Sequence, residues 1–181
     1  TAHELGHKRG ARAGWLAKLA LAQTGYGHFY IEHNRGHHVR VATPPDPASA
    51  RYGETFYGFW VRTVTGSVAS AWRLERERLA ELGAPAWSWR NHNLQGWALT
   101  ALLFAALVAI FGLTLVPLLL AQAVIGFSLL ELVNYVEHYG LLRARDAGGE
   151  YEQVAPKHSW NSNHLVSNLM LYHLQRHSDH H

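Results

Sequence analysis

Three short stretches of the sequence carry histidines at spacings that suit a shared metal site. One stretch opens the chain, a second lies at residues 33–38, and the third closes it at residues 177–181. Residues three or four apart share one face of a helix, so each stretch would present its imidazoles together. Imidazole is the most common metal-ligating side chain. We therefore predict that these histidines form the sides of one metal site: His3, His7, His33, His37, His38, His177, His180 and His181.

The number of candidate ligands indicates two metal ions. Eight histidines are clustered, and His138 makes a ninth candidate, whereas a site with a single metal uses three or four protein ligands. The chain has no cysteine, which excludes thiolate zinc sites and iron–sulfur clusters. Nitrogen ligands suit zinc, copper, nickel or iron, and the ligand type alone does not separate these metals. Three isolated histidines are interpreted as structural: His28, His92 and His158.

Several polar residues accompany the rings and could hold them from outside. A metal-bound imidazole usually donates its second N–H to a carboxylate or a carbonyl, which fixes its tautomer and orientation. Glu137 could alternatively bind the metal directly. We expect these residues to surround the ligands: Glu4, Glu32, Glu137, Asp179 and His173.

The elements that must position these residues read as helices. Helical composition covers residues 3–27, and the second histidine stretch extends from about residue 28 to residue 41. A break follows, in which Asp46-Pro47 could cap a new helix. Apolar residues then recur at helical spacing from residue 55 to residue 82. A closing helix should begin near residues 161–163 and carry the final histidines.

Residues 91–130 contain no Asp, Glu, Lys or Arg. Forty residues of helix would extend roughly 60 Å, which is about twice the hydrocarbon core of a bilayer. Gly112 interrupts this run near its middle. We predict a transmembrane hairpin of two helices, Gly96–Phe111 and Leu115–Val133; the alternative is a pair of buried helices in a soluble protein.

Two membrane spans would return the chain to its starting side, so all the histidine stretches would lie on one face of the membrane. Arginines flank both ends of the hairpin, and the positive-inside rule makes that face cytoplasmic. The expected fold is therefore an all-α integral membrane bundle, a single domain over residues 1–181. Residues 1–90 and 134–181 form its cytoplasmic side, and residues 91–133 form the hairpin. Because predicted ligands stand at both ends of the chain, we expect an internal fragment of a longer protein.

Other functions fit the sequence less well. The formal charge of +3 is scattered among acidic residues, which does not favour nucleic-acid binding. Residues His3 to His7 match the HExxH pattern of zinc proteases, with Glu4 as the general base, but that reading leaves six clustered histidines unexplained. A metal transporter would place polar ligands within its membrane spans, and the uncharged hairpin carries no histidine cluster.

The motifs together resemble the membrane di-iron enzymes that activate O2, a group that includes fatty-acid desaturases, lipid hydroxylases and alkane monooxygenases. Their histidine boxes correspond here to His3–His7, His33–His38 and His177–His181. Within the group the sequence is most similar to the bacterial alkane 1-monooxygenases (AlkB-type alkane hydroxylases). The stretches that carry this similarity are HELGHK, EHNRGHH, NYVEHYG and LQRHSDHH.

The resemblance implies a function and a set of partners. It implies two irons held by the nine histidines His3, His7, His33, His37, His38, His138, His177, His180 and His181. It also implies O2 as co-substrate, a medium- or long-chain n-alkane as substrate, and a 1-alkanol as product. Electrons would come from rubredoxin, which a reductase and NADH supply. The enzyme would lie in the bacterial inner membrane, and its first membrane helices would precede this fragment. The alternative is a membrane fatty-acid desaturase or another lipid hydroxylase with the same boxes.

Overall fold

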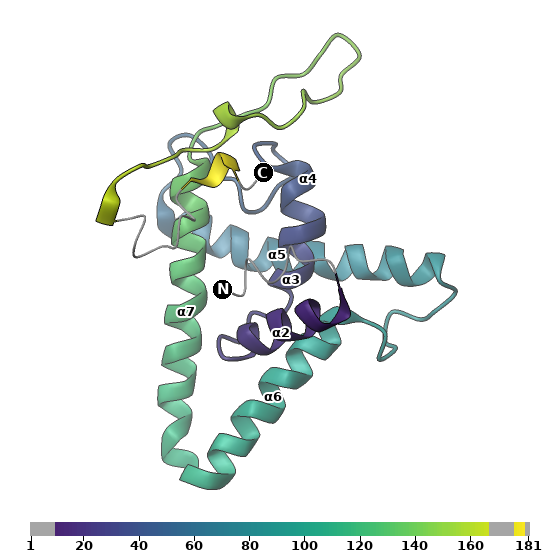
Figure 1. Cartoon of the computed structure of the whole chain (residues 1–181), viewed down its shortest axis with the longest axis vertical. Coiled ribbons are helices and arrows are strands. Elements are labelled where there is room, and N and C mark those ends of the chain that lie inside the picture. Colours follow the sequence, from purple (N-terminus) through teal and green to yellow (C-terminus); the bar gives the residue numbers. More distant parts are fainter. Residues whose placement is uncertain (1–9, 167–175, 180–181) are drawn as a thin grey trace. The chain divides into compact units, whose positions relative to one another are not determined.

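The computed structural model describes residues 10–166 and 176–179, and its regular elements there are helices (Figure 1). Extended pairing among these residues is limited to isolated bridges, Arg145 with Tyr151 and Asn161 with Arg176. The predicted all-α fold is confirmed. In chain order the helices are α2 (Ala11–Ala22), α3 (Phe29–Ile31), the π-helix η1 (Glu32–His37), α4 (His38–Arg40), α5 (Phe56–Glu81), α6 (His92–Phe111), the 3-10 helix η2 (Leu113–Leu115), α7 (Val116–His138), and the 3-10 helices η3 (Pro156–His158) and η4 (His177–Asp179).

The chain divides into two compact units, and each is built from two separate stretches. The first unit comprises Thr1–Gly36 and Gly66–Leu129, and the second comprises His37–Thr65 and Leu130–His181. In the first unit, α2 packs against α6. In the second unit, Phe59 of α5 is fully buried and its ring lies 5.3 Å from that of Tyr135 on α7.

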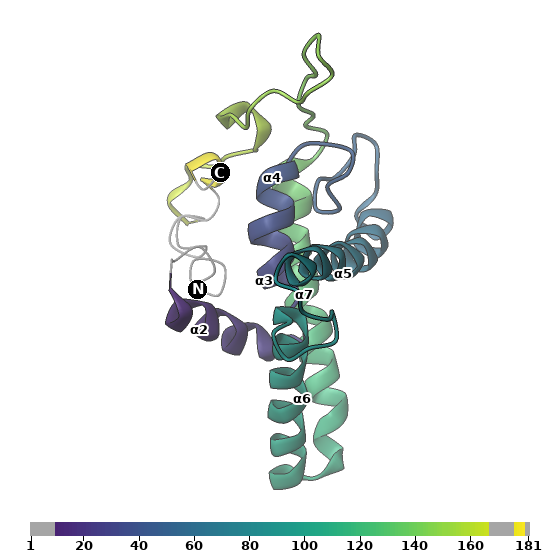
Figure 2. The ribbon, with the colours of Figure 1, turned by 90° about the vertical axis from the view of Figure 1, so that its right-hand side faces the viewer.

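Helices α6 and α7 form the apolar hairpin that the uncharged run predicted. Asn91 caps α6, because its side chain accepts a hydrogen bond from the Asn93 amide at 2.9 Å. Gly112 ends the helix with φ at 85°, a conformation that glycine adopts without strain, and η2 leads directly into α7 (Figures 1 and 2). Both helices are long and apolar enough to cross a bilayer, and only 11% of each hydrophobic segment is buried within the structure. This exposure is typical of lipid-facing helices and not of a soluble core.

The segment that carries the second histidine stretch is helical from Phe29 to Arg40, close to the predicted limits. Its centre, however, is the π-helix η1 and not an α-helix. Hydrogen bonds in a π-helix join residues five apart, and such turns are frequent at functional sites. The histidine spacings of four and five residues in this stretch therefore fall on a wider turn than the α-helix that the sequence predicted.

The expected closing helix does not begin at residues 161–163, since residues 165 and 166 are the first helical residues of this segment. Residues 161–164 are irregular, Arg176 lies in an isolated bridge with Asn161, and His177–Asp179 form a single 3-10 turn. The sequence predicted that the last three histidines share one face of an α-helix. This prediction is wrong for His177, which lies in a 3-10 turn. Asn161 replaces helical hydrogen bonding there, because its side-chain oxygen accepts a hydrogen bond from the Ser178 amide at 2.9 Å.

Candidate metal centre

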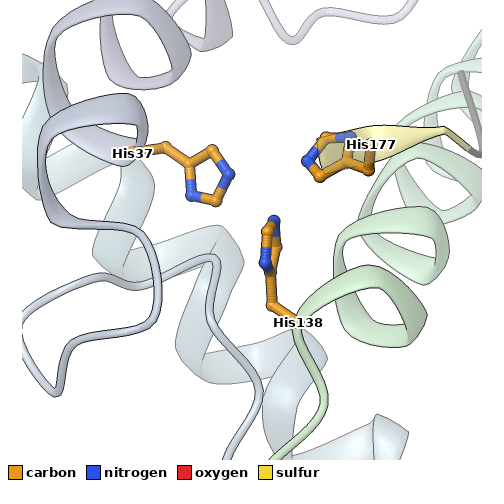
Figure 3. A group of neighbouring side chains, drawn as sticks. All are labelled: His37, His138 and His177. Carbon is orange, nitrogen blue, oxygen red and sulfur yellow. The ribbon is translucent and has the colours of Figure 1, made fainter. Parts of the chain in front are cut away.

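Three of the predicted ligands converge in the second unit. His37 ends η1, His138 ends α7 and His177 begins η4. One ring nitrogen of each lies within 4.8 Å of the others, and the three residues are 1%, 0% and 1% exposed (Figure 3). Nitrogens that share one ion at the usual metal–nitrogen bond of ~2.1 Å lie at most ~4.2 Å apart, so the rings would move closer together to hold one metal. We refer to these residues as the histidine group.

Asp46 orients the ring of His37. Its carboxylate lies 2.8 Å from Nδ1 of His37, and both side chains are buried. The same carboxylate accepts a hydrogen bond from the Ala48 amide at 3.1 Å and another from the Ser49 hydroxyl. These contacts fix the carboxylate, so that Nδ1–H of His37 donates to it and Nε2 is the nitrogen that could bind a metal.

The charge state of Asp46 supports this arrangement. Burial alone would raise the pKa of Asp46, but the His37 ring and the hydrogen bonds from His37 and Ser49 outweigh burial and hold the pKa below its usual value. The residue therefore stays ionised as an acceptor. The sequence had suggested that Asp46-Pro47 cap a helix. That expectation is wrong, since residues 44–48 form turns and the next helix, α5, begins only at Phe56.

A backbone carbonyl orients the ring of His138. Its Nδ1 lies 3.2 Å from the carbonyl oxygen of His158, so Nδ1–H donates to the chain and Nε2 is the candidate ligand atom. The ring of His158 fixes that carbonyl in place. Nδ1 of His158 accepts a hydrogen bond from the Ala155 amide at 2.9 Å, and its Nε2 lies 3.2 Å from Oε1 of Glu152. The short helix η3 thus serves to present one carbonyl to His138.

Glu137 is the third outer partner. Its Oε2 lies 3.1 Å from Nδ1 of His177, and the two side chains are 8% and 1% exposed. The Glu137 backbone carbonyl also accepts a hydrogen bond from the Trp160 amide at 2.8 Å. Each ring of the histidine group therefore has a carboxylate or carbonyl near its Nδ1. For His37 and His138 the contact is a hydrogen bond, the interaction that fixes the orientation of metal-bound histidines, and for His177 it is a short contact with Glu137.

The donor set fits a metal that prefers nitrogen ligands. The three imidazoles are buried and come from distant parts of the chain, and no thiolate competes because the chain has no cysteine. An imidazole binds a metal in its neutral form, through whichever ring nitrogen carries no proton. Such a site can hold zinc, copper, nickel or iron.

The remaining predicted site residues fall into two sets. His33 and Glu32 are each 2% exposed in the first unit, where the His33 ring stacks on Phe29 at 4.8 Å between centroids. His38 is half-buried, and its ring centroid lies 5.9 Å from that of His37. The others lie outside the described residues or, for Asp179, outside the described side chains: His3, Glu4, His7, His173, His180, His181 and Asp179.

Sequence reasoning missed two residues that hold the histidine group. Asp46 stands in a proline-rich stretch that reads as a loop, and a carboxylate nine residues after His37 gives no helical spacing to detect. His158 contributes a backbone oxygen, and no side-chain pattern reveals which carbonyl a ring will meet. The sequence did single out Glu137, because it lies next to His138 at the end of the apolar run.

Comparison with known proteins gives a consistent set of relatives. The family described as fatty acid desaturase matches residues 1–181. Alkane 1-monooxygenase of Acinetobacter baylyi is 55% identical over 100% of this chain and 44% of its own length. Alkane 1-monooxygenase 1 of Alcanivorax borkumensis is 54% identical over 100% of this chain and 45% of its own. The xylene/toluene monooxygenase hydroxylase component XylM of Pseudomonas putida is 29% identical over 99% of this chain and 47% of its own. The chain thus spans about half the length of these relatives.

Proposed function

This chain belongs to the fatty acid desaturase family, and we propose that the full-length protein is a membrane alkane 1-monooxygenase. It would use O2 to hydroxylate the terminal methyl group of medium- or long-chain n-alkanes to 1-alkanols. The observation that carries the proposal is the buried convergence of His37, His138 and His177 in a chain whose 181 residues are 55% identical to 44% of an alkane 1-monooxygenase. A terminal methyl group offers no acid, base or leaving group, so its oxidation calls for redox-active metal chemistry.

We propose iron as the metal and two ions as its number. A pair of irons, when bound, would supply the activation of O2 and the oxidation of an unactivated C–H bond. The group of three rings could contribute to one such site, and the other candidates would complete it. The proposed ligands are His3, His7, His33, His37, His38, His138, His177, His180 and His181.

The surrounding residues have a defined task in this proposal. Asp46, Glu137 and the carbonyl of His158 each accept or face the Nδ1 side of one ring. They would hold the proton on Nδ1 and leave Nε2 as the metal-binding atom. Because the rings are at most 1% exposed, the protein also limits access of water to the atoms that bind the metal. The chain's own contribution is thus orientation, tautomer control and exclusion of solvent.

The proposed partners follow from the substrate and the reaction. Hydroxylation with O2 consumes two electrons and two protons, and we propose rubredoxin, its reductase and NADH as the electron source. Helices α6 and α7 expose apolar side chains along most of their length, which suits insertion into a bilayer that also dissolves the alkane. The proposed location is the bacterial inner membrane, with the histidine motifs on the cytoplasmic side.

The test uses the full-length protein in membranes with rubredoxin, rubredoxin reductase, NADH and n-octane. We expect 1-octanol from the wild type together with about two irons per chain. His138→Ala should reduce both alcohol and iron, whereas His164→Ala, which alters an exposed residue, should change neither. Stoichiometric zinc and activity without electrons would overturn the redox assignment.

Product analysis separates the alternative enzyme from the proposed one. A desaturase of the same family would convert an acyl chain into an alkene and would give no 1-octanol. Supplying an acyl substrate in parallel with n-octane therefore distinguishes the two functions. A new double bond without alcohol formation would assign the chain to desaturation.

A further inference from the structure

One buried carboxylate outside the histidine group connects three elements of the first unit. Glu75 lies on α5 and its side chain is fully buried. It accepts hydrogen bonds from Arg78 on its own helix at 2.8 and 2.7 Å, from Arg35 of η1 at 3.1 Å, and from the backbone amide of His92 at the start of α6 at 2.8 Å. The site described above does not use this carboxylate.

The contact with α6 places the carboxylate where it is electrostatically favoured. Amide groups in the first turn of a helix have no partner within the helix, and the helix dipole attracts negative charge to that end. Glu75 accepts from the His92 amide in the first turn, and Arg78 also donates to the carbonyl of Arg90 at 2.7 Å. The carboxylate is therefore anchored to the beginning of the apolar hairpin, independently of Arg35.

The hydrogen bond between Glu75 and Arg35 connects the carboxylate to the second histidine stretch. Arg35 stands within the π-helix η1, two residues after His33. A π-helix is a rare conformation that needs support from its surroundings. The fixed carboxylate of Glu75 gives η1 such a support at a point close in sequence to a candidate ligand.

We propose that Glu75 is a positioning residue that holds η1 through Arg35 and thereby sets the position of His33. This proposal rests on the proposed function, because it takes His33 to be a metal ligand. The alternative to this proposal is that the ion pair between Arg35 and Glu75 only stabilises the fold. The Arg35 side chain is 43% exposed, and pairs with an exposed partner contribute little to global stability. The effect of Arg35 should therefore appear in the local geometry of η1 and not in the unfolding temperature.

The test compares Arg35→Gln, Glu75→Gln and the double variant in the full-length protein, purified in lipid nanodiscs. Arg76→Gln and Glu77→Gln are matched controls, since they make the same changes at exposed positions of α5. Three quantities are measured: the affinity for Co(II) added to the metal-free protein, amide hydrogen exchange of residues 29–40 without metal, and the unfolding temperature without metal.

We expect Arg35→Gln to weaken Co(II) binding by about ten-fold, the lower range for losing a partner that orients a ligand. Exchange across residues 29–40 should accelerate while the unfolding temperature stays close to that of Arg76→Gln. Glu75→Gln should weaken binding at least as much, and the double variant should bind no more weakly than Glu75→Gln, because both changes break one contact.

Unchanged exchange and unchanged Co(II) affinity in Arg35→Gln would overturn the positioning role. So would a loss of affinity that merely follows a lower unfolding temperature. The proposed function fails separately, if the wild type binds metal but makes no 1-octanol. The exchange measurement needs no metal and no activity, so it decides the role of Glu75 in either case.

Discussion

Among the described residues, the buried histidines of the histidine group differ from the buried His28. In the second unit, the rings of the histidine group lie together and each has a carboxylate or carbonyl beside Nδ1. In the first unit, His28 is also only 3% exposed, but it lies among aromatic rings, with Tyr26 at 4.3 Å and Trp97 at 6.3 Å between centroids. Neither nitrogen of His28 has a hydrogen-bond partner among the residues that the structure describes. His28 and the histidine group are thus both buried, and they differ in whether a carboxylate or carbonyl lies beside Nδ1.

The difference shows how a buried imidazole becomes a candidate ligand. An acceptor at Nδ1 fixes the tautomer and aims Nε2, so the ring is prepared for a metal before the metal arrives. Among the described residues His28 has no such acceptor, and burial lowers its pKa to about 4, which keeps the ring neutral. Its polar atoms are a cost to the fold, on the order of 1–3 kcal/mol for an unsatisfied buried group.

The largest effect is expected from removing the charge of Asp46. In Asp46→Asn the amide can present its NH2 group to Nδ1 of His37, which favours the wrong tautomer for a ligand at Nε2. Metal affinity of the full-length protein should fall about 10- to 100-fold, with a parallel loss of hydroxylation. Glu150→Gln, which removes a charge at an exposed position, is the control. Equal metal affinity in Asp46→Asn and wild type would mean that the carboxylate does not fix the tautomer of His37.

A second prediction concerns pH and His28. Its pKa of about 4 in the folded protein is below the unfolded value of about 6.5, so the unfolded state binds more protons between these values. Stability of the metal-free protein should therefore be complete above about pH 6.5 and decline toward pH 4, by an amount on the order of 3 kcal/mol. His28→Phe should remove most of this decline in unfolding experiments at several pH values.

The same variant separates the two kinds of histidine. Metal release on acidification reflects protonation of the ligand rings, so it should persist in His28→Phe, while the loss of stability that His28 causes disappears. Equilibrium dialysis at pH 7 and pH 5 measures this release. If His28→Phe abolished metal binding at pH 7 while remaining folded, His28 would belong with the ligands and the distinction would fail.

The smallest effect is expected at His158. His158→Ala keeps the backbone carbonyl that faces His138 and removes only the ring that anchors it to Ala155 and Glu152. Metal affinity should fall by less than the ~10-fold typical of losing an outer partner. Lys157→Ala removes the neighbouring contact with Glu152 and serves as the control. A loss as large as that in Asp46→Asn would show that a ring, and not a carbonyl, controls His138.

Much of the helical framework could be predicted from the sequence. The helix expected over residues 55–82 is α5, and the hairpin expected at Gly96–Phe111 and Leu115–Val133 is α6 and α7, extended by a few residues at their outer ends. These predictions succeeded because periodicity and hydropathy are local properties of the chain. The expected start of the closing helix was wrong for the opposite reason: Asn161 forms a bridge with Arg176 and accepts a hydrogen bond from the Ser178 amide, and no local sequence pattern predicts contacts between residues so distant in sequence.

The site was predictable in its chemistry and not in its geometry. Spacing identified His37 and His177 as candidates, and His138, which follows the apolar run, was counted beside them as the ninth. The spacing argument assumed α-helical faces, whereas His37 ends a π-helix and His177 begins a 3-10 turn. Asp46 and the carbonyl of His158 were not predicted, because each meets its ring only through the path of a loop.

The sequence by itself determined which imidazoles are candidate metal ligands, the absence of thiolates, and the apolar hairpin, since these depend on composition and on neighbours along the chain. The tertiary structure decided which histidines of the described chain meet and which groups lie beside their Nδ1 atoms, and it surrounded His28 with aromatic rings instead. Which histidines meet and which groups lie beside them depends on contacts between residues distant in sequence. The free energy of these contacts depends on burial and on the acceptor that lies beside each ring.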